Sequence, residues 1–222
     1  VCKNFSKAKN LRTANEGDVK SAEKVVDVIR VARPPVVTVE NVPAYRDTAL
    51  FGMITDALSD GGYSWSADIL DAADYGAAQE RSRLILRAVR DGTLPPLPQK
   101  TGPSDWFDAV RDLIPSAEES SLPAWERARI NKMVRAGTLS WSSPIITMGG
   151  SASRGTAHAR NSGGPAPTLV ATPKSVPRIV MPDGVVKRVS PRMMARLMGI
   201  KDSLPLPDSR LLAKEVLGNG IH

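Results

Sequence analysis

An apolar run that ends in a carboxylate constrains the possible fold of this chain more than any other feature of its sequence. Residues 36–39 read Val-Val-Thr-Val, after Pro34 and Pro35, and Glu40 follows them directly. Such a run is typical of a buried strand in a parallel sheet. A carboxylate at the carboxyl end of such a strand lies where open α/β sheets place their ligand crevice. Alternatively, Glu40 caps the following helix, which is the commoner role for a single Glu after a strand.

The elements expected around this run predict an α/β sheet, because helices and strands alternate along the chain. In order, they are a helix from an N-cap at Asp18 to about Arg33, the strand at 36–40, a helix over about 44–58 that is stopped by Gly61-Gly62, and strands at 63–70 and 84–89. The last two are expected to form an antiparallel, hairpin-like pair at the sheet edge.

The character of the chain changes at about Gly92. A proline-rich linker over 93–98 leads into a segment whose apolar spacing predicts helix. The elements expected beyond the linker are helices within 104–137, short β-prone runs at 145–147, 168–170 and 178–180, and a helix that begins at Ser190-Pro191.

Charge and cysteine content narrow the class of protein. The formal charge of +7 and the pI near 9.8 favour a polyanionic partner, because Lys and Arg gain affinity by displacing counterions from phosphates. One cysteine excludes an internal disulfide framework and fits a reducing compartment, so we expect a cytoplasmic protein. The two histidines and the cysteine are far apart and show no metal-ligand spacing, and no apolar run is long enough to cross a bilayer.

Five short motifs occur in a fixed order along almost the whole chain. They are Val-Cys-Lys-Asn-Phe-Ser at 1–6, Glu-Asn-Val at 40–42, Tyr-Gly-x-x-Gln-x-Arg-x-Arg at 75–83, Arg-Val-Ser-Pro-Arg with Ala-Arg-Leu-Met-Gly within 188–199, and Gly-Asn-Gly-Ile at 218–221. Each is weak alone, but together they resemble the DNA (cytosine-5) methyltransferase family. The resemblance implies a bacterial or phage enzyme of the kind found in restriction-modification systems.

The resemblance also implies a domain organisation. It predicts part of a Rossmann-like, S-adenosylmethionine-dependent methyltransferase sheet in 1–92, a smaller mixed target-recognition domain in 93–186, and a return to the catalytic domain in 187–222. The family's glycine-rich cofactor loop precedes the nucleophile, and no such loop precedes Cys2 here. We therefore expect an interior fragment, with the cofactor-binding half either truncated or supplied by a complementing chain.

Four residues are the catalytic candidates. Cytosine C5 is a poor nucleophile, and a thiolate that adds at C6 activates it. Cysteine suits this role because it is strongly nucleophilic and leaves readily. The resemblance assigns the thiol to Cys2, a proton or hydrogen bond to N3 to Glu40, base orientation to Arg83, and the holding of nearby carboxylates or phosphate to Arg81.

The remaining candidates contact DNA or cofactor. The partner implied is double-stranded DNA, from which the target base must be flipped into the pocket. The residues assigned to DNA are Asn41, Gln79, Arg154 and Arg160, the last two either reading guanine edges or gripping phosphates. Asn219 is assigned to S-adenosyl-L-methionine by the last motif.

Departures from the family pattern leave alternatives open. Val1 replaces the usual Pro before the nucleophile, and Met193 replaces a Glu. The alternatives are a non-catalytic DNA-binding fragment or subunit that needs a partner chain, a tRNA cytosine-5 methyltransferase of the same fold, and a Cys-His hydrolase that pairs Cys2 with His158.

Overall fold

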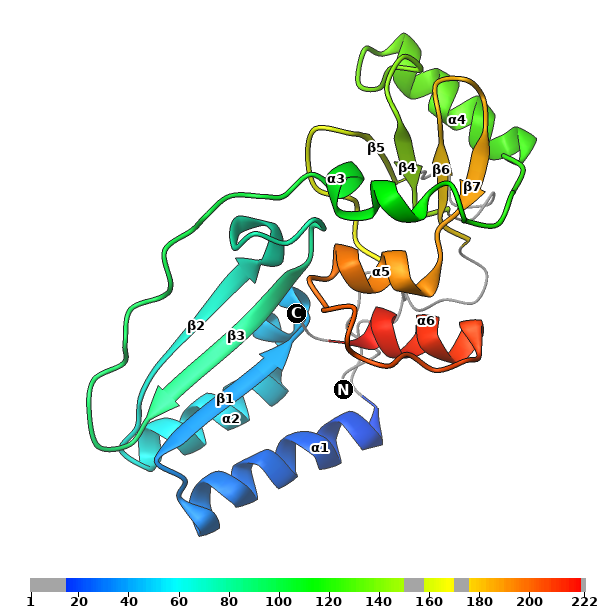
Figure 1. The fold of residues 1–222 in the computed structure, drawn as a ribbon. Helices are drawn as coiled ribbons and strands as arrows, with labels where there is room; N and C mark the ends of the chain where they lie inside the picture. The colour runs from blue at the N-terminus through cyan, green and yellow to red at the C-terminus, as the bar shows by residue number, and fades with distance from the viewer. Residues whose placement is uncertain (1–14, 150–157, 170–175, 221–222) are drawn as a thin grey trace. The chain divides into compact units, whose positions relative to one another are not determined.

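The computed structural model describes residues 15–149, 158–169 and 176–220, and the chain forms two compact units (Figure 1). The first unit comprises Val1–Asp71 and Ser82–Gln99, and the second comprises Ala72–Arg81 and Lys100–His222. The short segment Ala72–Arg81 thus belongs to the second unit, although the residues before and after it belong to the first.

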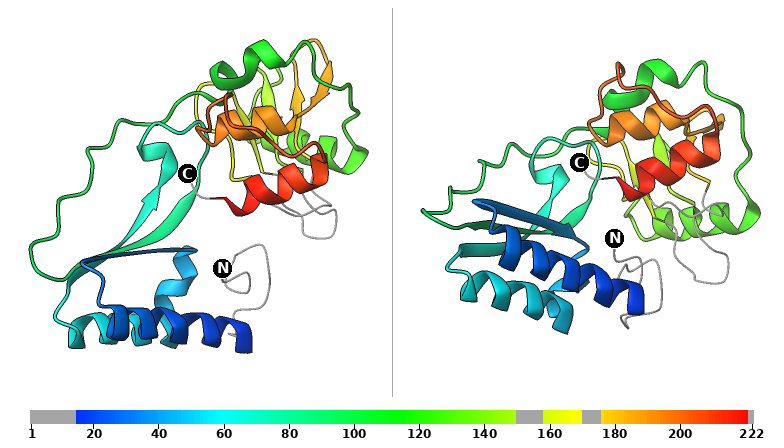
Figure 2. Two further views of the ribbon diagram at one scale, coloured as in Figure 1. Left: turned by 60° about the horizontal axis from the view of Figure 1, so that its bottom comes forward. Right: turned by 90° about the horizontal axis from the view of Figure 1, so that it is seen from below.

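The first unit is a three-stranded antiparallel sheet with helices on one face (Figures 1 and 2). Its elements are α1 (Glu16–Asp27), β1 (Val36–Asn41), α2 (Ala49–Asp60), β2 (Ser64–Asp71) and β3 (Ser82–Val89), and the strand order is β1-β3-β2. Helix and strand alternate as expected, which confirms the α/β class.

Strand β3 shows why the sheet has two different faces. Leu84, Leu86 and Ala88 are buried and belong to the core that α1 and α2 close. The residues between them are only half-buried. Because successive side chains of a strand point to opposite faces, Arg83 and Arg87 lie on the face away from this core.

The ends of the first two helices follow local capping chemistry. Asn15, not Asp18, is the N-cap of α1, and Asp18 is the third helical residue of a capping box, in which it accepts from Asn15 N. The prediction placed the cap three residues too late because Asp also caps helices. Helix α2 is capped by Thr48 and ends at Gly61, as expected.

Strand β1 differs from its expected environment. It pairs antiparallel with β3, and Val36 is 61% exposed. The prediction of a buried, parallel-type strand was therefore wrong for the described residues, although the strand itself is present. The expected antiparallel pair β2–β3 is confirmed, but β3 is the central strand and not an edge.

The second unit combines a small antiparallel sheet with four α-helices (Figure 1). Its elements are α3 (Trp106–Val110), α4 (Ala124–Arg135), β4 (Ile145–Thr147), β5 (Ala159–Asn161), β6 (Arg178–Val180), β7 (Val186–Arg188), α5 (Pro191–Leu197) and α6 (Arg210–Asn219), with strand order β5-β4-β6-β7.

One large apolar cluster holds most of the second unit. Trp106 of α3, Ile146 of β4, Met193 of α5 and Leu217 of α6 all belong to it. Helix α5 therefore packs in the same core as α3 and the small sheet. The assignment of 93–186 to target recognition and of 187–222 to catalysis is a statement about roles and stays a prediction.

Most expected elements of this unit are present. The segment 104–137 forms two helices with a break between them, and runs 145–147 and 178–180 are strands. No strand forms at the described residues Thr168 and Leu169, while 159–161, which was not expected, forms β5. Ser190 caps α5 as predicted. In the described ranges, no helix is long and apolar enough to span a membrane.

Candidate functional site

The polar face of the three-stranded sheet carries an ion pair between two of the predicted catalytic residues. Arg83 Nε lies 2.7 Å from Glu40 Oε1, and each side chain is about a fifth exposed. Glu40 lies opposite Ile85 in the β1–β3 register. Arg83 is two residues before Ile85 and so shares its face. The pair is a diagonal cross-strand contact, and it joins the Glu-Asn-Val and Gln-x-Arg-x-Arg motifs.

A second ion pair lies on the same polar face. Arg87 Nη2 is 3.6 Å from Asp68 Oδ2 on β2, and the same nitrogen donates to Ser66 Oγ at 3.2 Å. This face of the sheet therefore carries two ion pairs, and side chains of all three strands contribute to them.

Arg81 has a different environment although it belongs to the same motif. Its residue is 2% exposed, and Nη2 donates to the carbonyl oxygens of Gly218 at 3.1 Å and Gly220 at 2.6 Å. Nη1 lies 3.4 Å from the Leu169 carbonyl oxygen. A cation that hydrogen-bonds these carbonyl groups stabilises the C-terminal end of α6. The structure therefore places Arg81 on the Gly-Asn-Gly motif, whereas the prediction placed it on carboxylates or phosphate.

Gln79 is completely buried, and its side-chain amide has no hydrogen-bond partner among the described residues. Its backbone lies beside residue 166: Ala166 N donates to Ala78 O, and Glu80 N donates to Ala166 O, both at 2.8 Å. A fully buried Gln cannot contact DNA without a rearrangement of the segment around it.

Arg160, a predicted DNA contact, is held by a residue of the third motif. Its Nη2 lies 2.8 Å and 3.1 Å from the two carboxylate oxygens of Glu80. The Arg160 side chain is still 53% exposed. The sequence prediction missed Glu80, although its place beside Gln79 in the motif was a signal that it had a role.

The two predicted asparagines lie at the ends of their elements. Asn41 closes β1, and its Oδ1 accepts from Val42 N at 2.8 Å, which turns the chain after the strand. Asn219 is the last residue of α6 and is exposed. Cys2 and Arg154 lie outside the described residues.

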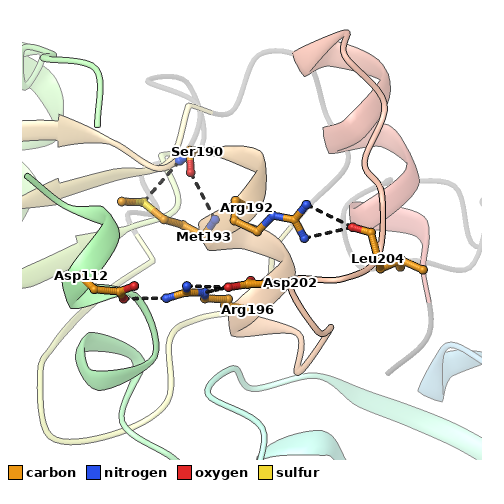
Figure 3. A network of polar contacts seen from close by, with 7 residues as sticks. All are labelled: Asp112, Ser190, Arg192, Met193, Arg196, Asp202 and Leu204. Carbon is orange, nitrogen blue, oxygen red and sulfur yellow. Dashed lines mark hydrogen bonds and ion pairs between the residues drawn. The ribbon is translucent and has the colours of Figure 1, made fainter. Parts of the chain in front are cut away.

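Arg196 organises a polar cluster that the sequence did not predict (Figure 3). Its Nη1 lies 2.5 Å from Asp112 Oδ1, and its Nη2 lies 2.6 Å from Asp202 Oδ2. The guanidinium holds the pKa of both carboxyl groups below their usual range, and hydrogen bonds to the two carboxylates raise the pKa of Arg196. The cluster ties helix α5 to Asp112 near α3 and to the segment after α5.

Met193 occupies the position of the family's Glu in a capping box (Figure 3). Ser190 Oγ accepts from Met193 N at 3.2 Å, and Ser190 N lies 3.4 Å from Met193 Sδ. A thioether is a weak acceptor. The helix start is therefore retained with methionine at this position.

A buried polar network lies beneath α4. Glu126 is completely buried, and its Oε2 lies 3.0 Å from Arg178 Nη1 while its Oε1 accepts from Thr147 Oγ1 at 2.6 Å. Each carboxylate oxygen thus has a partner from the sheet. No group of three potential metal-ligating side chains occurs in the described part of the chain.

Solved structures define the class of this fold. The chain is similar over its full length to an Entamoeba histolytica methyltransferase, EhMeth, with a TM-score of 0.62 at 12% identity over 70% of that chain. It is similar over 99% of its length to a putative DNA modification methyltransferase encoded within an E. coli prophage, with a TM-score of 0.56 at 18% identity over 72% of that chain. The fold is that of a methyltransferase.

The sequence comparison specifies the family. The model of the C-5 cytosine-specific DNA methylases matches residues 2–222, and the chain belongs to that family. It is 38% identical over 109 residues to the type II methyltransferase M.XorII of Xanthomonas oryzae. The aligned region covers 46% of this chain and 25% of that protein. The chain is 23% identical over 232 residues to M.FnuDI of Fusobacterium nucleatum, which covers 91% of this chain and 64% of that protein. The chain thus spans between a quarter and two thirds of these relatives.

Proposed function

We propose that this chain carries the base-activating and target-recognition part of a DNA cytosine-C5 methyltransferase. The observation that carries the proposal is the ion pair between Glu40 and Arg83, which brings two family motifs together on one face of the sheet at 2.7 Å. Membership of the C-5 cytosine-specific DNA methylases supports the same activity. The type II relatives support a role in a restriction-modification system.

The proposed reaction begins with the thiolate of Cys2, which adds to C6 of a flipped cytosine and forms a sulfur–carbon bond. Electron density moves toward C5 and N3, and Glu40 holds a proton or hydrogen bond at N3. S-adenosylmethionine, when bound, supplies the methyl group that C5 receives. Loss of the C5 proton then lets Cys2 leave as a thiolate and restores the aromatic ring.

Arg83 positions Glu40 in this scheme. A guanidinium at 2.7 Å fixes the carboxyl group on the polar face of the sheet, and its remaining nitrogens are donors for the base. Only one of them has a partner among the described residues, the Ser82 carbonyl oxygen at 2.9 Å. Arg83 therefore has the donors to orient cytosine while it holds Glu40.

One described residue is assigned to the cofactor. Asn219 is exposed at the end of α6, and its exposed amide fits a hydrogen bond to a polar group of S-adenosylmethionine. Arg81 holds the carbonyl groups on both sides of Asn219, so it sets the position of this amide. The proposed partner is double-stranded DNA, and the proposed location is the cytoplasm.

Covalent capture tests the proposal. DNA that contains 5-fluorocytosine should trap the complete gene product containing this chain, in the presence of S-adenosylmethionine, because fluorine blocks loss of the C5 substituent. Peptide mass spectrometry should find the adduct on Cys2. An adduct that persists in Cys2→Ser, or no adduct with the unaltered protein, contradicts the assignment.

The same experiment separates the alternatives. A non-catalytic DNA-binding subunit would retain DNA without forming any adduct. A tRNA methyltransferase would form its adduct with 5-fluorocytosine in RNA and not in duplex DNA.

A further inference from the structure

Helix α4 presents a solvent face with cations and no acid. Arg127, Lys132 and Arg135 are exposed and Asn131 is half-buried on its flank, and at 3.6 residues per turn the four lie on one side of the helix. The only acidic residue of α4 is Glu126, which is completely buried. We call the four residues the α4 basic face.

Ion pairing separates this face from six other arginines of the second unit. In the described part of the chain, none of the three cations of the α4 basic face pairs with a carboxylate. By contrast, the arginines of this unit that do pair with one are Arg111, Arg160, Arg178, Arg188, Arg196 and Arg210. Among the described residues, no carboxylate therefore offsets the charges of the three cations of the α4 basic face.

The neighbouring cleft adds to the same chemistry. It has a volume of about 290 Å³ and is bounded by Arg127, Asn131 and Trp141, together with the β6–β7 turn. The Arg127 guanidinium lies 6.0 Å from the Trp141 ring centroid, a cation–π contact that orients it. Trp141 Nε1 donates to Asn131 Oδ1 at 3.1 Å. The Asn131 amide nitrogen then remains as a donor without a partner among the described residues.

The α4 basic face is also firmly supported from below. Ile130 is completely buried in an apolar cluster with strand residues such as Ile145 and Val180, and Glu126 is tied to Arg178 and Thr147. The helix is thus fixed on its sheet, so the backbone that carries these side chains does not have to be ordered when a partner binds.

We propose that the α4 basic face grips the phosphate backbone of duplex DNA without reading its sequence. Guanidinium and ammonium groups are donors only, and Asn131 offers its amide nitrogen because its Oδ1 already accepts from Trp141. Such donors match phosphate oxygens. Because arginine also reads guanine, an equal loss of affinity on all duplex sequences is the result that identifies a phosphate contact. This surface belongs to the second unit, whereas the Glu40–Arg83 pair belongs to the first. The choice of DNA as the polyanion rests on the proposed function.

The test removes two exposed side-chain charges that have no hydrogen-bond or ion-pair partner among the described residues. Lys132→Gln/Arg135→Gln keeps good helix formers on α4, so circular dichroism and thermal unfolding should not change. In anisotropy titrations of the 222-residue chain, the variant should bind all duplex sequences more weakly. The slope of log affinity against log salt should fall by about two units, because each phosphate contact contributes about 0.9.

A matched control removes the same net charge elsewhere. Arg111 and Lys201 are exposed cations of the second unit outside the face, and Arg111→Gln/Lys201→Gln should leave the slope nearly unchanged. Equal losses in both double variants would reduce the effect to net charge and overturn the proposal. An unchanged slope in Lys132→Gln/Arg135→Gln, tighter binding of duplex RNA than of DNA, or no duplex binding by the unaltered chain would also overturn it.

Methyl transfer by the complete gene product separates the two proposals. Methylation with an unchanged salt slope would leave the proposed function in place and remove the α4 basic face. A reduced slope in a protein that does not methylate cytosine would retain the surface and remove the function.

Discussion

Glu40 and Arg83 form an ion pair of 2.7 Å between neighbouring antiparallel strands, on the face of the sheet opposite the helices. The contact exists because β3 runs antiparallel to β1 and brings the third motif back to the end of the second. A substitution at either residue breaks this contact. Its effects on the free energy of unfolding and on the methyl-transfer rate can then be measured separately.

Glu40→Gln should affect catalysis far more than stability. The side chains are partly exposed, so we expect a loss of about 1 kcal/mol or less in the free energy of unfolding. Loss of a positioned acid should lower the methyl-transfer rate about 10²–10⁴-fold. Urea unfolding and single-turnover methylation measure the two. A rate within about tenfold of the original would remove Glu40 from the proposed mechanism.

Arg81→Met should destabilise the protein more than Arg83→Met. Arg81 is buried and holds two carbonyl groups at the end of α6, and each hydrogen bond to a charged group contributes about 1.5–3 kcal/mol. Arg83 forms one partly exposed ion pair, for which about 1 kcal/mol is expected. Hydrogen exchange should show faster exchange in 210–219 for Arg81→Met alone. Equal exchange in both variants would contradict the clamp.

Arg160→Ala separates base reading from phosphate gripping. If Arg160 reads guanine, Arg160→Ala should lower the binding free energy for the cognate site by about 1–3 kcal/mol. A phosphate contact would instead weaken binding on all duplexes and lower the salt slope by about one unit. Glu80→Gln removes the carboxylate that holds the Arg160 side chain. It should therefore raise the affinity for DNA that Arg160→Ala lowers. No change in either variant would remove Arg160 from the DNA contacts.

Arg178→Met should be strongly destabilising, because it leaves the buried Glu126 carboxylate without its cation. A broken buried pair costs about 3–5 kcal/mol. The double variant Glu126→Met/Arg178→Met removes both charges and should recover much of that loss. Urea denaturation of the two single variants and the double variant gives the coupling energy. Additive losses would show that the two side chains are not coupled.

The Arg196 cluster predicts an acid-dependent contribution to stability. Arg196 lowers the pKa of Asp112 and Asp202 from the ordinary value of 3.8. Their contribution is therefore complete above about pH 4 and is lost as the pH falls through the lower folded-state values. The destabilisation by Arg196→Met should be constant near neutral pH and should shrink in acid. In an Asp112→Asn/Asp202→Asn background it should no longer depend on pH, and urea midpoints at several pH values test both.

The order of the motifs and the local patterns determined a large part of this protein from sequence alone. They gave the family, the α/β class, the helix start at Ser190, and the selection of Glu40 and Arg83. The β-prone run 84–89 predicted a strand, because strand propensity depends largely on residues that are neighbours along the chain.

Tertiary structure alone decided which charged groups are buried and which are paired. Arg81 and Arg83 are two residues apart in one motif and look equivalent by any local rule. Their burial differs because Arg81 contacts segments near 169 and 218–220, while Arg83 meets Glu40 across a strand pair. The antiparallel setting of β1 likewise depends on β3. Arginines such as Arg178 are paired through contacts that are distant in sequence.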